Sequence, residues 1–312
     1  MEFSFQFLTG EVAALIAALF WATASISFAE IGRHIQATHL NLVKGGLAVL
    51  LMVVVLALGS LFDIPSITAA TVTSIPATGW LLLSISGIVG IAVGDSAYFA
   101  CLKRIGPQKG LMLESTAPIL AALLALALYD EYLPLASWTG IGLTTFGVIV
   151  VVRFGVAADY YRNSFGGILF GLLASTGQAT GIVLSRMALD GENIAPLAGG
   201  LVRLTAGLVG LALWLTLLRA VRKTREKTPA IFASVKILME KHLLAKLFNA
   251  MFIGTFLAIW LQQLAVKFTS AGIAQALFAA CPMIGTLLAV RQGRKQPGVV
   301  WFGLALGMVG IA

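Results

Sequence analysis

The chain has 312 residues, of which 59% are hydrophobic and 11% are charged. Soluble domains carry about 45–50% apolar and about 25% charged residues, so this composition excludes a soluble globular protein and predicts an integral membrane protein. The formal net charge of +8 is better explained by loops that face an anionic membrane surface than by binding of nucleic acid.

Cysteine and histidine are too few and too scattered to predict a metal site. Cys101 and Cys281 both lie inside apolar segments, which argues against a disulfide framework and against a thiolate metal site. His34, His39 and His242 do not have the spacing of metal ligands. No cofactor is therefore predicted.

Ten apolar segments are expected to cross the membrane, because a spanning helix needs about 20 apolar residues. Residues 1–10 have neither a basic n-region nor a cleavage site, so the first segment is expected to be a retained helix. The last segment is shorter than the others, and it either stops within the membrane or is cut short. The predicted segments are Glu11–Phe28, Leu40–Leu61, Thr78–Cys101, Gly110–Tyr129, Leu135–Val152, Ser164–Met187, Pro196–Leu218, Leu247–Val266, Gly272–Val290 and Gly298–Ala312.

Basic residues fall mostly on one side of this predicted bundle. Of the 21 Lys and Arg residues, Lys44 and Arg203 lie within segments, and Arg186 and Lys267 lie on the side of the N-terminus. The other 17 lie in the opposite connections. The positive-inside rule places that richer side in the cytoplasm of a bacterial-type inner membrane, with both termini outside.

The longest connection, residues 219–246, is rich in Lys and Arg. Its second part, from Pro229 to Phe248, has apolar residues at helical spacing with Lys between them, a pattern typical of a helix that lies on the membrane surface. A flexible basic linker that joins two halves of the chain is the alternative. Neither interpretation implies chemistry.

Three stretches of the first half of the chain recur in the same order in the second half. Lys44 falls opposite Arg203 in the first pair of stretches, and Pro118 falls opposite Pro282 in the second. In the third pair a tryptophan and two glycines coincide. The aligned stretches are Asn41–Met52 with Gly200–Leu211, Ala117–Leu126 with Cys281–Val290, and Ser137–Val150 with Val300–Ala312.

This pattern predicts an internal repeat, with residues 1–153 as the first unit and residues 154–312 as the second. A general bias of membrane helices toward small residues is the alternative. Each unit holds five predicted helices, an odd number, so the second unit crosses the membrane in the opposite sense to the first. Inverted repeats of this kind underlie many secondary transporters, with the substrate site near the midplane between the halves.

Residues 94–151 read GDSAYFACLKRIGPQKGLMLESTAPILAALLALALYDEYLPLASWTGIGLTTFGVIVV, and residues 254–290 echo the pattern as GTFLAIWLQQLAVKFTSAGIAQALFAACPMIGTLLAV. With these stretches the chain resembles the EamA-like branch of the drug/metabolite transporter superfamily over nearly its whole length. The resemblance rests on small residues in helix 3, a proline in helices 4 and 9, and a Gly-patterned last helix. It implies a polytopic carrier of small organic metabolites, commonly an exporter, that works by alternating access.

The resemblance also includes an acidic residue in the turn after helix 4. That residue tends to recur in both halves of the family's proteins, and Glu131 fits it in the first half. The second half has Gly293, Arg294 and Lys295 there instead. This departure weakens any symmetric role for the turn.

Glu114 is the first candidate site residue, because it is the one carboxylate in the apolar run from Gly110 to Leu128. A charge at membrane depth costs about 2.5–3.5 kcal/mol on insertion scales, so such residues usually face a bundle interior and serve function. Pro118 removes a backbone hydrogen bond one turn later. A bent helix that lines a polar cavity is the expectation, and a Glu–Lys pair beside an ordinary membrane proline is the alternative.

Asp95 is expected at a depth similar to Glu114, and Lys44 lies within range of both. A Lys–carboxylate pair there is the structural interpretation. The functional interpretation is that one acid, withdrawn from water, binds a coupling proton or a cationic group of the substrate. Neither acid recurs in the second half, where Ile259 aligns with Asp95 and Phe278 with Glu114.

Neutral polar side chains are the second half's expected contribution to the cavity. Stability alone is a weak reason for several of them, because interhelical hydrogen bonds in membranes contribute only about 0.6 kcal/mol each on average. Contact with a ligand and bonding between helices are both open for these residues. The candidates are Gln178, Gln262 and Gln275, with Gln263 and the helix 6 residues Ser175, Thr176 and Thr180 as further polar groups.

Arg203, Trp21 and Tyr98 complete the candidate site. Arg203 either extends to the external surface or balances a substrate carboxylate. Trp21 and Tyr98 are aromatic residues with a polar atom at plausible cavity depth, and packing is the alternative role of each.

The sequence therefore predicts a secondary carrier that moves a small organic solute through a cavity lined by helices 1, 3, 4, 6, 8 and 9. Amino acids, nucleosides and drug-like metabolites are the candidate solutes, and a proton is the candidate coupling ion. The protein is not expected to be an enzyme, because no Ser-His-Asp set, HExxH motif or phosphate-binding Gly loop is present. A membrane-embedded lipid-modifying enzyme and a channel or scaffold are the rival hypotheses.

Overall fold

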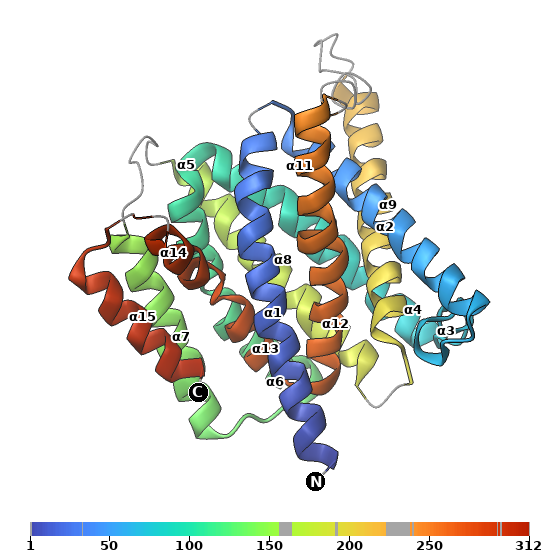
Figure 1. The fold of residues 1–312 in the computed structure, drawn as a ribbon, viewed down its shortest axis with the longest axis horizontal. Helices are drawn as coiled ribbons and strands as arrows, with labels where there is room; N and C mark the ends of the chain where they lie inside the picture. The colour runs from blue at the N-terminus through green and yellow to red at the C-terminus, as the bar shows by residue number, and fades with distance from the viewer. Residues whose placement is uncertain are drawn as a thin grey trace.

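The structure, a computed structural model, describes residues 2–32, 34–155, 164–190, 193–222, 238, 240–291, 293 and 295–311, and every regular element among them is helical (Figure 1). The all-α prediction is confirmed. In chain order the elements are α1 (Glu2–Ile31), α2 (Ala37–Leu61), η1 (Pro65–Ile67), α3 (Ala70–Thr73), α4 (Ala77–Gly87), η2 (Ile88–Asp95), α5 (Ser96–Glu114), α6 (Ala117–Tyr129), α7 (Leu135–Phe154), α8 (Phe165–Leu189), α9 (Pro196–Arg222), α11 (Lys241–Met251), η3 (Phe252–Leu257), α12 (Ala258–Phe268), α13 (Ala271–Phe278), α14 (Cys281–Arg291) and α15 (Gly298–Ile311).

Eight helical stretches in the described part of the chain are long and apolar enough to cross a membrane, and two shorter apolar stretches follow them, Ala271–Leu287 and Gly298–Ile311. Lipid offers no partner to a bare peptide group, so each crossing has to satisfy its backbone internally, as a helix does. These helices make the chain a multi-pass integral membrane protein.

The predicted basic connection is shorter than expected at both ends. α9 continues to Arg222, and α11 begins at Lys241, so residues 219–222 and 241–246 are helical. Of the helix predicted on the membrane surface, Pro229–Phe248, residues 229–237 and 239 lie outside the described residues, and residues 241–248 belong to α11. Leu238 is buried against Leu40 and Leu243 in the apolar cluster between α1 and α11.

Two corresponding helices are interrupted in front of a proline, as the repeat predicts. α5 ends at Glu114 and α6 starts at Ala117, with Pro118 in its first turn. In the second half α13 ends at Phe278 and α14 starts at Cys281, with Pro282 as its second residue. Because proline lacks an N–H, the carbonyl four residues before it loses its helical partner. Those carbonyls belong to Glu114 and Phe278.

The third helix of each half contains a stretch of wider π-helical turns. These stretches are η2, which ends at Asp95, and η3, which ends at Leu257. Such π-helical turns are rare and occur frequently at functional sites. The sequence pattern did not predict them, because a π turn keeps the same apolar composition as an α turn.

The connection predicted between helices 3 and 4 is itself helical. α5 is continuous from Ser96 to Glu114, yet the chain reverses within it. A Cβ on Gly167 of α8 would contact Ile105, whereas a Cβ on Gly171 would contact both Cys101 and Leu113. The two arms of α5 therefore lie side by side against α8.

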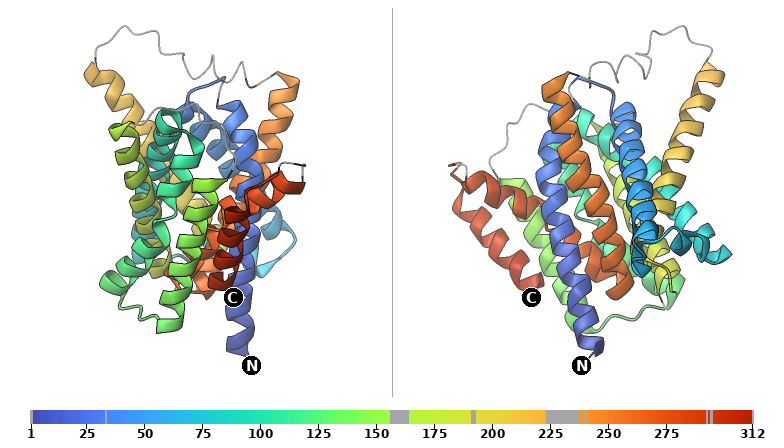
Figure 2. Two further views of the ribbon diagram at one scale, coloured as in Figure 1. Left: turned by 90° about the vertical axis from the view of Figure 1, so that its left-hand side faces the viewer. Right: turned by 45° about the vertical axis from the view of Figure 1, so that its right-hand side comes forward.

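Glycines bring the last helices of the two halves into close contact. α7 and α15 lie side by side (Figure 2). A Cβ on Gly140 would meet the carbonyl of Gly310, and a Cβ on Gly147 would meet the carbonyl of Gly303. The repeat aligns Gly140 with Gly303 and Gly147 with Gly310, so exchanging the halves exchanges one contact for the other.

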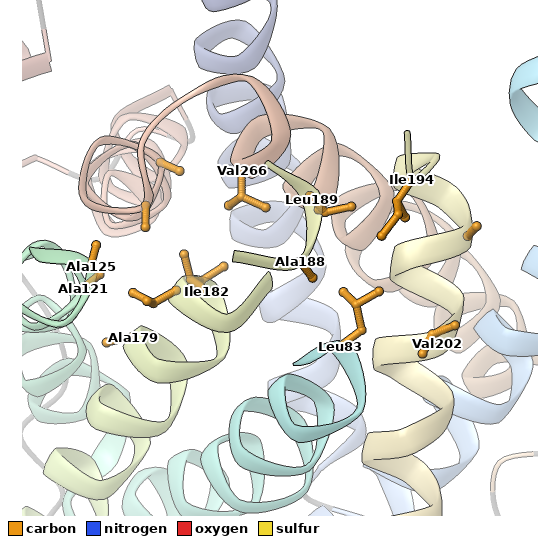
Figure 3. Close-up of a cluster of buried hydrophobic side chains, with 14 of the residues drawn as sticks. Leu83, Ala121, Ala125, Ala179, Ile182, Ala188, Leu189, Ile194, Val202 and Val266 are labelled. Atoms are coloured by element: carbon orange, nitrogen blue, oxygen red, sulfur yellow. The ribbon is translucent and has the colours of Figure 1, made fainter. Parts of the chain in front are cut away.

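The largest apolar cluster joins helices of both halves (Figure 3). Ala121 and Ala125 of α6 face Ile182 of α8, and Val266 of α12 lies over Leu189 at the end of α8. Small residues permit the close approach of helices that the membrane requires, because lipid gives apolar faces little reason to associate. The glycine pattern of helix 3 has this role: Gly90 and Gly94 face glycines of α8, and Gly87 faces the backbone of α9.

Candidate functional site

A central cavity of about 110 Å³ lies between the two halves. Eight of the nine residues predicted for the site line it: Trp21, Lys44, Asp95, Glu114, Gln178, Arg203, Gln262 and Gln275. The walls come from the predicted segments 1, 3, 4, 6, 8 and 9, as expected. The second and seventh segments, α2 and α9, also contribute, with Lys44 and Arg203. Liquid water occupies about 30 Å³ per molecule, so the cavity has room for several water-sized groups.

Lys44 forms an ion pair with Asp95. The ammonium lies 3.7 Å from the carboxylate, and the two side chains are 4% and 19% exposed. The same ammonium lies over the rings of Trp21, at 5.3 Å, Phe28, at 5.3 Å, and Phe99, at 5.9 Å. Aromatic faces attract a desolvated cation. The structural interpretation of a Lys–carboxylate pair therefore applies to Asp95, and Trp21 contributes to holding the cation.

Glu114 has a different environment. Its carboxylate lines the cavity and forms a hydrogen bond with the side chain of Tyr98. Among the described residues no Lys, Arg or His lies within ion-pair distance of Glu114. Within this part of the chain Glu114 thus has no lysine partner. Tyr98 does not line the cavity itself and reaches the site through Glu114.

Arg203 is buried against the second half. Only 2% of this residue is exposed, so it does not extend to the surface. One guanidinium nitrogen donates to Gln262 Oε1 at 2.7 Å and, more weakly, to Gln263 Oε1 at 3.5 Å. Within the described ranges no acid lies within ion-pair distance of Arg203. Its charge is therefore held by neutral amides.

Three polar atoms of the cavity wall have no hydrogen-bond partner among the described residues. They are Arg203 Nε, Gln275 Oε1 and Thr255 Oγ1. Buried polar groups are paired in almost all proteins, and an exception calls for an explanation such as contact with a ligand. Unpaired polar atoms on residues that line the cavity are suited to a small polar solute.

The two halves contribute unequally to the wall. Ile259 and Phe278, which align with Asp95 and Glu114, also line the cavity. The repeat thus brings equivalent positions of both halves to one cavity. These positions carry carboxylates in the first half and apolar side chains in the second. The basic positions are equivalent in both halves, since Lys44 and Arg203 both face the cavity.

Thr255, Ser115 and Cys281 also line the cavity and were missed in the sequence. A signal was present for Thr255, because Thr255, Ile259 and Gln262 are four and three residues apart and so lie on one helical face. Ser115 and Cys281 stand beside the interruptions before Pro118 and Pro282. Their neighbours in sequence gave no comparable pattern.

Glu131, the acidic residue of the turn after helix 4, lies away from the cavity. Its Oε1 accepts from Arg186 Nε at 3.1 Å, and its Oε2 accepts from the backbone N–H of Ala271 at 3.0 Å. The carboxylate therefore joins the end of α6 to α8 and to the first residue of α13. This contact joins the first half to the second.

Comparison with known proteins was decisive for the family. The model of the EamA-like transporter family matches residues 8–153 and again residues 165–312. The chain belongs to the EamA-like transporter family. Its two EamA repeats together span most of the chain, and the family is one of transporters.

The EamA fold of this chain also resembles a solved structure described as "Crystal structure of protein". That structure is 18% identical in sequence, the match covers 97% of this chain and 95% of the other, and the TM-score is 0.70. At this identity the likeness shows the fold alone. No curated protein sequence matches the chain.

Proposed function

We propose that this EamA protein is a secondary carrier that moves a small organic solute across the cytoplasmic membrane by alternating access. The observation that carries the proposal is the central cavity, which both repeats line. Around this one space lie an acid that has no ion-pair partner among the described residues and a buried arginine that donates to amides. Charges this deep are costly, so a structural role alone is a poor reason to keep them.

The transport cycle would rest on ten crossings arranged as two inverted repeats. Two features support this arrangement: the exchange of the Gly140–Gly310 and Gly147–Gly303 contacts under the repeat, and the matching interruptions before Pro118 and Pro282. Interrupted helices in equivalent positions are typical of carriers whose halves move against each other around a central site.

Glu114 is the proposed coupling residue. Asp95 is occupied by Lys44, whereas Glu114 has only the Tyr98 hydroxyl as a partner among the groups described above. A carboxylate of this kind can exchange a proton or the cationic group of a solute without first breaking an ion pair. Arg203, with Gln262 and Gln275, is the proposed site for an anionic or carbonyl group of the solute.

The orientation rests on the basic connections. The end of α9 and the start of α15 neighbour the basic loops. The positive-inside rule puts those loops in the cytoplasm and both termini outside. Export of a metabolite is then movement from the side of α11's first turn to the side of Glu131.

A two-step experiment tests the carrier function. The purified protein is first screened by thermal shift against pools of amino acids, nucleosides and other metabolites. Hits are then offered as labelled solutes to proteoliposomes with and without a pH gradient. We expect at least one solute to raise Tm and to be taken up in a saturable way. The proposal would be contradicted if no metabolite raised Tm and the vesicles took up none of the labelled solutes.

A further inference from the structure

At one end of the molecule a set of bonds is centred on Glu131 and Arg186. Besides accepting from Arg186, Glu131 accepts from the N–H of Ala271. Arg186 NH1 donates to the backbone carbonyls of Val266, at 3.1 Å, and Lys267, at 2.9 Å. We call these side chains and the atoms they bind the Glu131–Arg186 clamp.

Further bonds extend the clamp over the same face, which we call the Glu131 face. Arg186 lies 3.1 Å from Asp190, which accepts from the hydroxyl of Tyr129 at 2.6 Å. The ammonium of Lys267 donates to the carbonyl of Ile194 at 2.7 Å. The ends of α6, α8 and α12 and the starts of α9 and α13 therefore meet in one hydrogen-bonded layer.

The clamp lies beyond the cavity on every helix that reaches it. Along α8 the order is Gln178 in the cavity wall, Ile182 in the apolar cluster and Arg186 in the clamp. Along α12, Gln262 lines the cavity, and Val266 belongs to both the cluster and the clamp. Figure 3 shows Ile182, Val266 and Leu189 of this apolar layer close together. A path from the cavity to the Glu131 face has to cross both layers.

Most of the clamp's bonds hold one short turn. Only Thr269 and Ser270 connect α12 to α13. Arg186 binds the carbonyls just before this turn, and Glu131 binds the N–H just after it. Because α13 contributes Gln275 and Phe278 to the cavity wall, movement of this turn would move the wall as well.

At the opposite end, which we call the Lys246 face, the ion pair between described residues is more exposed. There Lys246 donates to Glu30 at 2.6 Å, and the two side chains are 34% and 48% exposed, against 14% and 13% for Arg186 and Glu131. Exposed ion pairs contribute little because solvent screens them. A cleft of about 500 Å³ lies between α1 and α11 at this end, and it is lined by Thr23, Ser27 and Lys246 among others.

We infer that the Glu131–Arg186 clamp is the gate that keeps the cavity closed at the Glu131 face, and that the α12–α13 turn is the part that moves when the gate opens. The inference rests on the proposed carrier function. Glu131, in the turn after helix 4, then has a role that needs no equivalent carboxylate in the second half. The single clamp already joins this turn to both halves.

Cys281 provides a built-in reporter for this gate, since it lines the cavity. In a Cys101→Ala background the remaining thiol is labelled with a membrane-impermeant methanethiosulfonate, applied separately to each face of sealed vesicles. We expect slow labelling from the Glu131 face in the otherwise unsubstituted protein. Glu131→Gln and Arg186→Gln should each raise that rate about tenfold, the effect of a shift of about 1.4 kcal/mol between two states.

Three features of the experiment distinguish opening of the gate from unfolding of the protein. A shift of population toward the open gate lowers labelling from the Lys246 face while it raises labelling from the Glu131 face, whereas unfolding raises both. Glu131→Gln also keeps an oxygen that can accept from Ala271. Asp130→Asn is the matched control, because Asp130 lies beside Glu131 in the same turn, is exposed, and takes part in none of the bonds of the clamp given above. It should leave both rates unchanged.

The outcomes separate the gate from the carrier function. Rates from the Glu131 face that stay at the unsubstituted value in both Glu131→Gln and Arg186→Gln would overturn the gate and leave the carrier untouched. An equal increase in Asp130→Asn would overturn it too. Equal labelling from both faces in the unsubstituted protein would overturn the carrier function, and the gate with it.

Discussion

The two halves of the cavity wall place matching positions around one space but fill them with different chemistry. Lys44 and Arg203 are equivalent in the repeat, and both are buried cations. Asp95 and Glu114 belong to the first half alone, and the second half has Ile259 and Phe278 in their places. The comparison shows that geometry is shared between the halves whereas acid chemistry is confined to one.

The difference also assigns distinct tasks to the two acids. Asp95 balances Lys44, the cation of its own half. Arg203, the equivalent cation, is held by Gln262 and Gln263. Of the two acids in the cavity wall, Glu114 is therefore the one that is not paired with Lys44 or Arg203. If the halves exchange roles during transport, this asymmetry makes the two directions of the cycle chemically distinct.

Among the substitutions that test this difference between the halves, removal of the Glu114 carboxylate should have the largest effect on transport. In Glu114→Gln the first half loses the one group proposed to exchange a proton, so uptake driven by a pH gradient should disappear while thermal stability and exchange of bound solute persist. Gradient-driven uptake into proteoliposomes measures this. Glu11→Gln, a carboxylate of α1 that does not line the cavity, is the control. Undiminished coupling in Glu114→Gln would remove Glu114 from the mechanism.

Replacing Arg203 should weaken solute binding next most strongly. Arg203→Met leaves the oxygen of Gln262 and any anionic group of the solute without their donor, and loss of a buried charged partner costs about 2–5 kcal/mol, or about 30-fold or more in affinity. Binding of a solute found by thermal shift is measured by titration calorimetry. Arg104→Gln, at an exposed position, is the control. Unchanged affinity for anionic solutes would show that Arg203 only packs.

Breaking the pair of Lys44 and Asp95 should lower stability. Removing one partner of a buried ion pair costs about 3–5 kcal/mol, whereas removing both costs less. Lys44→Met and Asp95→Asn should therefore each lower Tm, and the double variant should recover part of the loss. A double-mutant cycle on purified protein measures this. Additive losses would mean that the two groups are not coupled.

The second-half counterparts should matter least. Phe278→Leu and Ile259→Val change the size of the apolar wall without changing its charge. We expect Ile259→Val to shift KM by a few fold, since one buried CH₂ group contributes about 0.8 kcal/mol, or about fourfold in affinity. Gradient dependence should stay as it is in both variants. Loss of gradient-driven uptake in Phe278→Leu would mean that coupling is shared by both halves.

The sequence predicted the membrane class, the repeat and most of the cavity because each depends on strong local costs. A carboxylate in lipid needs a polar surrounding, so the sequence could assign Glu114, Asp95 and Lys44 to one interior. For Arg203 it left the external surface open as well. Pro118 and Pro282 likewise marked the two interruptions.

Partners and turns could not be predicted in the same way. The choice of Asp95 over Glu114 as the partner of Lys44 depends on which helix faces converge. The clamp of Glu131 and Arg186 joins residues that are far apart in the chain, and Arg186 counted in the sequence only as a basic residue at a helix end. The helical reversal within α5 and the π-helical turns of η2 and η3 have no signature in apolar periodicity.

Counterflow tests the central claim most directly. Proteoliposomes are loaded with unlabelled solute, diluted into a trace of the labelled form, and the label inside is followed in time. A carrier whose cavity opens to one face at a time predicts a transient accumulation of label above its equilibrium level, which Glu114→Gln should retain. A steady approach to equilibrium with no overshoot, as through a channel, would contradict the account.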